Sequence, residues 1–540
     1  MAPFNLVGFW NNHPVPNKLF VESISGDFMM SHVKTLNYPQ TFRKTILPDV
    51  SKIQPSIFVP RHELAPEVLA AEANTQGWDT ASAVRLTQVN AALTKSDVSP
   101  KSFSYEVSKD WTANGDFGPW TMSRGGSGSI VFLKVPITKA SMTASSKKLD
   151  IVDGYVTIQV KLNYLPQPEG KDADKGVPND LVTDFKERSP EDPAVVIQNI
   201  NYGSATPPPD LQALFYFIID LWFNDNLKLF NYVFAVVSLN QVSKSKQFDW
   251  LKPTYTSYAY YDGDKDTPSE DEGYFGVLNM TNGKAPSGLA NQLPASAIPP
   301  DQGAALLIGN NLFLENMILP AVQGAFPDAS ASDFTITNDF SSVELKQPLD
   351  IDQVKVGLIW YQPTVTSMIL QIVGDEIQTR MSVHVPISPG IDSYVTMETW
   401  NRLELVTKPD GTQTIGWVES REPIKNSYYT KSVGVIVTEV IVAIIGAVAV
   451  GVAGKLLTGI VRVVVIIIIG IIAGLAAATP TLIAETISKG AANALPPINV
   501  MLTEFTDPIE WPDATGFILS SVQLNGSLQL SGNFEIGTVS

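Results

Sequence analysis

The pattern that decides the fold lies in residues 522–536, which read VQLNGSLQLSGNFEI. An apolar residue or a glycine stands at every even position, from Val522 to Ile536, and a polar residue stands at every odd position. Strict alternation is typical of a β-strand with one face in water and the other on an apolar surface. At roughly 3.3 Å per residue, the segment predicts one strand about 50 Å long. Gly526 and Gly532 lie on its apolar side, where a missing side chain lets the sheet bend or another backbone approach.

Alternating segments elsewhere in the chain indicate more strands of the same kind. In the clearest one, Val156, Ile158, Val160 and Leu162 alternate with polar residues. Further strands are expected at residues 248–262, 273–281, 352–361, 381–385 and 393–407. The fold class is therefore predicted to be α+β and mainly β, with long antiparallel sheets.

Apolar helices are expected to interrupt these strands. Residues 211–223 carry apolar side chains around nearly the whole circumference of a helix, so we expect that helix to be buried. Residues 433–487 contain two uncharged runs, and the second, 463–484, is long enough to span a bilayer. A long buried helix or helical hairpin within a sheet, a membrane-inserting segment and an oligomer contact all explain such a run.

Composition excludes one large class of partner. The 540 residues include 54 acidic residues against 37 Lys and Arg, which gives a formal charge of −17. A phosphate backbone would repel this charge unless basic residues were strongly clustered, and the sequence has no such cluster, so we expect no binding to nucleic acid. The chain has no cysteine, which removes disulfides and thiolate chemistry.

The first residues, MAPFNL, have neither a basic segment nor a continuous apolar segment. They therefore do not match a classical signal peptide. We expect a protein that stays in the cytoplasm or is released by a non-classical route.

The sequence contains none of the common catalytic motifs. None of the four histidines, His13, His32, His62 and His384, belongs to an H-E-x-x-H arrangement. The sequence has no G-x-S-x-G elbow, and its glycine-rich segment at 125–129 lacks the Lys-Ser/Thr ending of a P-loop. We expect no enzymatic activity, no metal site and no cofactor.

Several short segments, in this order along the chain, resemble the P47 and OrfX proteins encoded beside clostridial neurotoxins and in related insecticidal-toxin loci. The resemblance covers roughly residues 77–540 and is strongest between 230 and 330. The segments that carry it are GWDT (77–80), VN (89–90), VFAVVSL (233–239), FDWLKPT (248–254), SYAY (257–260), GVLNMT (276–281), LLIGN (306–310) and FLEN (313–316).

That family resembles the tubular lipid-binding (TULIP) superfamily, whose modules wrap a long antiparallel sheet around a long helix and often hold lipid between them. The resemblance implies an elongated architecture with three parts. Residues 1–76 would form an N-terminal extension or cap, 77–330 a first TULIP-like half, and 331–540 a second half with the apolar segment 433–487 and the C-terminal long strand.

The function expected from this reasoning is that of a non-enzymatic accessory protein of a bacterial toxin locus, which binds lipid or a membrane surface through an apolar groove. The ligand would be a bound lipid, and the partners a membrane surface and proteins of a toxin complex. Candidate lining residues are Phe215, Ile218, Trp222, Val522, Leu524, Leu528, Leu530, Phe534 and Ile536. The same side chains could instead pack on each other and leave no cavity. Alternative functions are a structural or protective toxin partner without lipid, and a membrane-inserting pore former.

Overall fold

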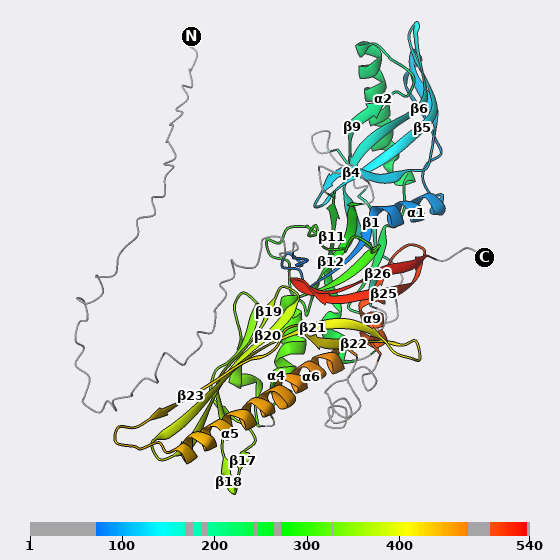
Figure 1. Ribbon diagram of the computed structural model, residues 1–540. Helices are drawn as coiled ribbons and strands as arrows, with labels where there is room; N and C mark the ends of the chain where they lie inside the picture. Colours follow the sequence, from blue (N-terminus) through cyan, green and yellow to red (C-terminus); the bar gives the residue numbers. More distant parts are fainter. Residues whose placement is uncertain are drawn as a thin grey trace, which may run out of the picture. The chain divides into compact units, whose positions relative to one another are not determined.

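Antiparallel sheets backed by apolar helices make up most of the structure (Figure 1). The computed structural model describes residues 72–473 and 497–536, apart from 168–175, 185–192, 242, 245, 264–271 and 327. The prediction of a mainly β fold with antiparallel sheets is confirmed. Of the expected N-terminal extension, residues 1–71 lie outside the described part.

The first helix-backed sheet has the strand order β2-β3-β5-β6-β9, and β4 pairs with β5. Its strands are β2 (Ser102–Ser108), β3 (Trp111–Phe117), β4 (Thr121–Ser127), β5 (Ile130–Ala144), β6 (Lys147–Val160) and β9 (Val195–Asn201). The alternation predicted at Val156, Ile158 and Val160 is confirmed, because all three side chains are fully buried within β6.

Helix α2 (Pro209–Asn226) packs against β2, β3, β5 and β9 of this sheet. The prediction that this helix is buried all round is wrong. Phe215 and Ile218 are fully buried, whereas Tyr216 and Phe217 are 43% and 45% exposed. The sheet covers one side of the helix only, so apolar character around the whole circumference did not imply complete burial.

A second sheet joins segments that are far apart in the sequence, in the order β11-β12-β1-β13-β26-β25. Its strands are β1 (Thr80–Arg85), β11 (Pro253–Tyr261), β12 (Tyr274–Thr281), β13 (Ala304–Gly309), β25 (Ala514–Leu524) and β26 (Ser527–Ile536). Helix α1 (Leu86–Ser96) follows β1 directly and packs on β4 and β12. The pairing of β13 with β26 connects residues on both sides of the predicted boundary at residue 330.

The predicted single strand at 522–536 is wrong, because the chain reverses direction at Asn525 and Gly526. Gly526 has φ of +73°, a conformation that favours glycine, and Asn-Gly is a strong hairpin signal. The apolar face was predicted correctly, since cross-strand partners share a face and Leu524 lies opposite Leu528. The turn has two residues, so the alternation of polar and apolar residues continues through it unchanged. For this reason the pattern did not reveal the hairpin.

The third sheet has the order β14-β15-β19-β20-β21-β22, with β16 paired to β19 and β23 paired to β21. Its strands are β14 (Phe334–Ile336), β15 (Ser342–Leu345), β16 (Leu349–Asp350), β19 (Thr364–Val373), β20 (Glu376–Ser388), β21 (Ile391–Thr407), β22 (Gln413–Glu419) and β23 (Ile424–Lys431). A separate hairpin, β17 (Val354–Val356) and β18 (Ile359–Tyr361), precedes β19.

A long apolar helix accompanies this sheet. It consists of α5 (Glu439–Lys455), one π-helical segment (Leu456–Val461) and α6 (Arg462–Ile472). By length and composition, this is one helix that could cross a membrane, and 71% of its most apolar window is buried. A helix was predicted here, and its described part is confirmed, whereas residues 474–487 of the predicted segment lie outside the described residues. Two short helices, α3 (Asn310–Phe313) and α4 (Leu319–Gly324), flank a π-helical turn (Leu314–Ile318), and α4 contacts α6.

A small sheet, β24-β10-β8-β7, completes the fold. Its strands are β7 (Leu162–Pro166), β8 (Val177–Thr183), β10 (Ala235–Leu239) and β24 (Ile509–Glu510). Helix α9 (Asn499–Thr506) leads into β24, and β24 leads directly into β25 of the second sheet. Residues 511–513 therefore carry the chain from one sheet to the next.

Candidate functional site

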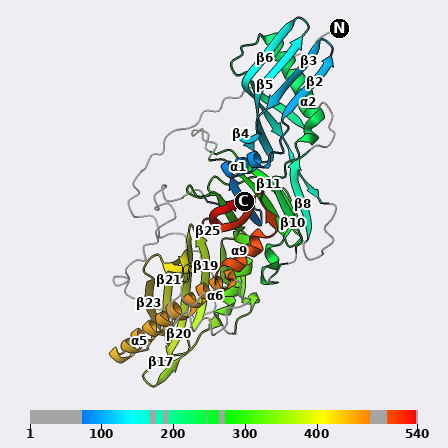
Figure 2. The ribbon, with the colours of Figure 1, turned by 90° about the vertical axis from the view of Figure 1, so that its right-hand side faces the viewer.

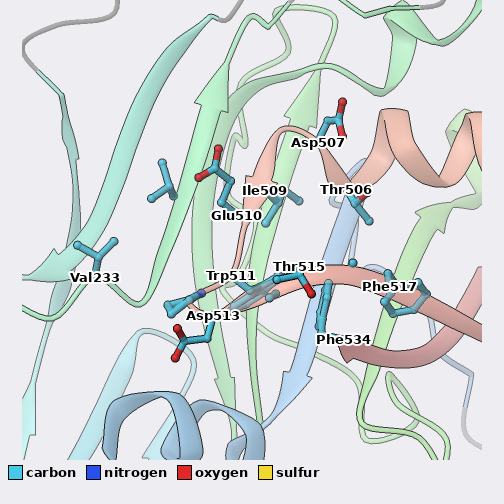
Figure 3. Close-up of a pocket in the computed structure, with 14 residues that line it drawn as sticks. Val233, Thr506, Asp507, Ile509, Glu510, Trp511, Asp513, Thr515, Phe517 and Phe534 are labelled. Atoms are coloured by element: carbon cyan, nitrogen blue, oxygen red, sulfur yellow. The ribbon is translucent and has the colours of Figure 1, made fainter. Parts of the chain in front are cut away.

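A pocket of ≈590 Å³ opens where the chain passes from β24 to β25 (Figure 3). Its walls come from the start of β10, the end of α9, residues 509–517 and Phe534 of β26. Ligand pockets commonly measure roughly 300–1,000 Å³, so the size suits a small ligand or part of a larger one.

Aromatic side chains form the apolar wall of the pocket. The Trp511 and Phe534 rings lie 6.1 Å apart, and the Phe517 and Phe534 rings lie 5.2 Å apart in an edge-to-face arrangement. Trp511 is 7% exposed, and its indole Nε1 donates a hydrogen bond of 3.2 Å to Ser82 Oγ on β1. This bond holds the indole in a fixed orientation, because a buried N–H needs an acceptor.

Charged side chains also line the pocket. Asp507 forms an ion pair with Lys244, and the hydrogen bond in that pair raises the pKa of Lys244. Asp513 lies 3.6 Å from Lys95. Glu510 is exposed and has no ion pair among the described residues. The pocket lining thus combines aromatic with charged side chains.

A second, smaller cavity lies behind the aromatic wall. It measures ≈20 Å³, room for about one water molecule, and shares Trp511, Pro512, Ala514 and Phe534 with the pocket. Tyr232 also lines it and is only 4% exposed, and its hydroxyl has no hydrogen-bond partner among the described residues. Burial, with a smaller contribution from the charge of Asp513, raises the pKa of Tyr232. A buried hydroxyl without a partner can form a hydrogen bond with a ligand or a water molecule, and this bond removes the free-energy cost of leaving the group unsatisfied.

Three of the predicted lining residues lie on α2 and pack tightly. Phe215, Ile218 and Trp222 are 0%, 0% and 4% exposed. The Trp222 ring lies 5.2 Å from Phe117 and 6.0 Å from Phe103, so it faces the sheet within a cluster of aromatic rings. These three side chains therefore belong to the buried core between α2 and the sheet.

The predicted lining residues in the C-terminal hairpin divide into three groups. Buried side chains at 0–4% exposure form the first group, which consists of Val522, Leu524, Leu528 and Leu530. Phe534 lines both the pocket and the small cavity. The side chain of Ile536 lies outside the described part of the structure.

Trp511 and Phe517 are the aromatic pocket residues that sequence reasoning missed. Their signal was present, since Pro512 and Asp513 follow directly after Trp511, and a proline followed by an aspartate is typical of a turn between strands. Asp513 does adopt a left-handed conformation, with φ of +60°. Among the described residues, no group of three or more His, Cys, Asp or Glu side chains could hold a metal ion.

The fold defines a class of mainly β proteins in which antiparallel sheets carry apolar helices, with a pocket at a crossing between two sheets. A family model described as OrfX-like, "Protein OrfX2/OrfX3/P47", matches residues 75–532. The chain therefore belongs to the OrfX-like family, as the resemblance in its sequence implied.

Relatives and solved structures agree with this assignment. The chain is 30% identical to "Protein OrfX3" of Paraclostridium bifermentans over 498 residues, which covers 86% of this chain and 99% of that protein. It is 28% identical to "Protein OrfX3" of Clostridium botulinum (strain Kyoto / Type A2), with the same coverage. The solved structure of P47 from Clostridium botulinum A2 covers 86% of this chain and 100% of its own, with a TM-score of 0.58 at 18% identity. At that identity, the likeness shows the fold.

Proposed function

We propose that this protein is a non-enzymatic accessory protein of a bacterial toxin locus and that it holds a lipid in the pocket between β24 and β25. Membership of the OrfX-like family supports the link to toxin loci that the sequence resemblance implies. The observation that carries the lipid proposal is the combination of aromatic and charged side chains in the lining of the pocket. An amphiphile likewise combines an apolar acyl chain with a polar headgroup.

The aromatic wall supplies the main free energy of binding in this proposal. Each methylene transferred from water to an apolar surface contributes about 0.8 kcal/mol. Charged residues supply polar partners for a headgroup, since Asp507 and Asp513 line the pocket and Lys244 forms an ion pair with Asp507. The apolar end of the lipid would then lie against Phe517 and Phe534.

The small cavity offers room to extend this site. Phe534 forms part of the wall between the pocket and the cavity. A rotation of its ring would join the two spaces and expose the Tyr232 hydroxyl to a ligand. Tyr232 would then donate a hydrogen bond to an oxygen of the bound lipid.

The experiment that tests the proposal is mass spectrometry of an organic extract from protein purified without detergent. We expect phospholipid at a near-stoichiometric ratio, and at least roughly tenfold less after the double substitution Phe517→Ser and Phe534→Ser, because each aromatic contact contributes about 1.5–3 kcal/mol. Ile518→Ser is the matched control. Ile518 is the next residue of β25, is 53% exposed and does not line the pocket, so this variant should keep its lipid.

A structural role without a lipid is the second candidate function, and the tight packing of Phe215, Ile218 and Trp222 favours it. In that case the helix-backed sheets form a scaffold that binds a toxin and holds no lipid. Protein that carries no lipid and also ignores added liposomes would exclude the lipid proposal and support this alternative.

A further inference from the structure

Helix α5 presents an uncharged apolar stripe to solvent. The residues of this stripe, Val440, Ala443, Ala447 and Val450, follow each other at intervals of three and four, so they lie on one side of the helix. Val440 and Val450 are 68% and 75% exposed. No charged residue occurs between Glu439 and Lys455. A surface helix normally carries polar residues on its outer side, so this stripe is expected to meet an apolar partner.

The β17–β18 hairpin adds a second exposed apolar surface beside α5. Its turn and second strand expose Leu358 (94%), Ile359 (54%) and Trp360 (58%). The hairpin contacts α5, and a Cβ atom on Gly451 would lie 2.5 Å from Val354 Cγ1. Figures 1 and 2 both show β17 next to α5. The stripe and the hairpin tip therefore belong to one region, which we call the α5–β17 surface.

Lysines surround this surface, although the chain as a whole is strongly acidic. Lys355 Nζ lies 5.2 Å from the centroid of the Trp360 ring, and Lys455 lies 3.6 Å from Asp352. On β23, which contacts α5, Lys425 pairs with Met397 and Lys431 pairs with Ile391. Directly opposed residues share a face, so both lysines lie on the same face of the sheet as the buried side chains of Met397 and Ile391.

The surface carries four lysines, although the whole chain has a net charge of −17. Lys355, Lys425, Lys431 and Lys455 lie on the hairpin, on β23 and at the end of α5. Asp352 pairs with Lys455, and Asp350, Glu422 and Glu439 are the other acidic residues nearest to these lysines in the sequence. The charged residues of β21 point the other way, since Asp392 and Glu398 alternate with its buried residues. Lysines grouped around an exposed apolar surface can contact the phosphates of an anionic bilayer, even in a chain of net charge −17.

We propose that the α5–β17 surface docks on an anionic lipid bilayer. Tryptophan and lysine side by side, as in Trp360 and Lys355, match the composition of protein surfaces at the boundary between headgroups and acyl chains. The stripe of α5 lies against the acyl region, and the lysines contact the phosphates. The surface consists of elements that do not line the lipid pocket, so this inference goes beyond the proposed function and can be tested separately.

Flotation of the full-length protein with vesicles tests the proposal. We expect binding to vesicles of equal parts phosphatidylcholine and phosphatidylserine, and weaker binding to pure phosphatidylcholine. The double substitution Leu358→Ser and Trp360→Ser should weaken binding at least roughly tenfold, since one fully buried apolar side chain accounts for about a tenfold change. Trp111→Ser is the matched control, because Trp111 is also an exposed tryptophan, at 41%, but lies on β3.

A second pair of variants separates charge from apolar contact. Lys425→Gln with Lys431→Gln should weaken binding to the anionic vesicles and leave binding to pure phosphatidylcholine unchanged. Equal binding by the Leu358/Trp360 variant and the wild type would overturn the proposal. The proposal would also be overturned if the wild type does not bind vesicles and instead forms a soluble dimer or a protein complex that these substitutions abolish. Lipid extracted from the pocket is unaffected by these variants, so failure here is distinguishable from failure of the proposed function.

Discussion

Helices α5 and α6 belong to one continuous helix and are both almost entirely apolar, yet they differ in their surroundings. The residues of α6 from Val464 to Ile472 are at most 8% exposed, whereas Val450 of α5 is 75% exposed. α6 packs on α4, on the π-helical turn Leu314–Ile318 and on β22. α5 contacts β17, β21 and β23. Hydropathy therefore predicted that the segment is buried, but the neighbouring elements decide how much of each half is buried.

The largest expected difference between the two halves concerns folding stability. Ile468→Ala in α6 removes a fully buried side chain and should lower the free energy of unfolding by about 2–5 kcal/mol. Val450→Ala in α5 should change it by no more than about 0.5 kcal/mol, because the side chain is already in solvent. Chemical denaturation, followed by circular dichroism, measures both.

Equal losses in these two variants would contradict the comparison. That result would mean that Val450 is covered in solution, for example by a second copy of the chain. Light scattering at several protein concentrations would identify such an oligomer.

The next effect concerns the contact between α5 and the β17–β18 hairpin. Gly451→Ala places a methyl group 2.5 Å from Val354 Cγ1, so the hairpin or the helix must shift. Overpacking of this kind costs about 1–3 kcal/mol. We expect a lower unfolding midpoint and faster amide hydrogen exchange in β17. Unchanged exchange would show that the hairpin does not rest on Gly451.

The sequence predicted the helix at α5 and α6 and the alternation of the strands, because both depend on local periodicity. It did not predict the turn at Asn525 and Gly526, since two residues leave the phase of a period-two pattern unchanged. Nor did it predict the exposed side of α2 at Phe217, because exposure depends on which strands cover the helix.

The pocket shows the same limit. Phe534 was predicted as a lining residue from its place in the alternation. Trp511 and Phe517 were not, because Trp511 lies in the crossing from β24 to β25 and Phe517 lies on β25 after it. Contacts between sheets that lie far apart in the sequence cannot be derived from periodicity.

A smaller effect of opposite sign is expected on the open side of α5. A Cβ atom at Gly446 would meet no atom within 4 Å, so Gly446→Ala should fit without strain. Alanine is the better helix former by about 0.5–1 kcal/mol, and we expect a stabilisation of that size. Thermal unfolding of this variant beside Gly451→Ala provides the comparison. A loss of stability at Gly446 would show that another part of the protein covers this side of the helix.

The smallest effect concerns the ion pair between Lys455 and Asp352, which connects the end of α5 to the segment before β17. The Asp352 side chain is 91% exposed, and the two charged groups are 3.6 Å apart. Exposed pairs of this kind contribute about 0–1 kcal/mol, so Asp352→Asn should leave the unfolding midpoint nearly unchanged. Its effect on vesicle binding should be larger than its effect on stability, because the substitution removes a carboxylate that repels phosphates and releases Lys455 to contact them. Tighter binding to phosphatidylserine vesicles, lost at high salt, is the expected result. If binding weakens instead, the pair serves to hold the hairpin in place, and the charge of Lys455 has no direct part in contacting the bilayer.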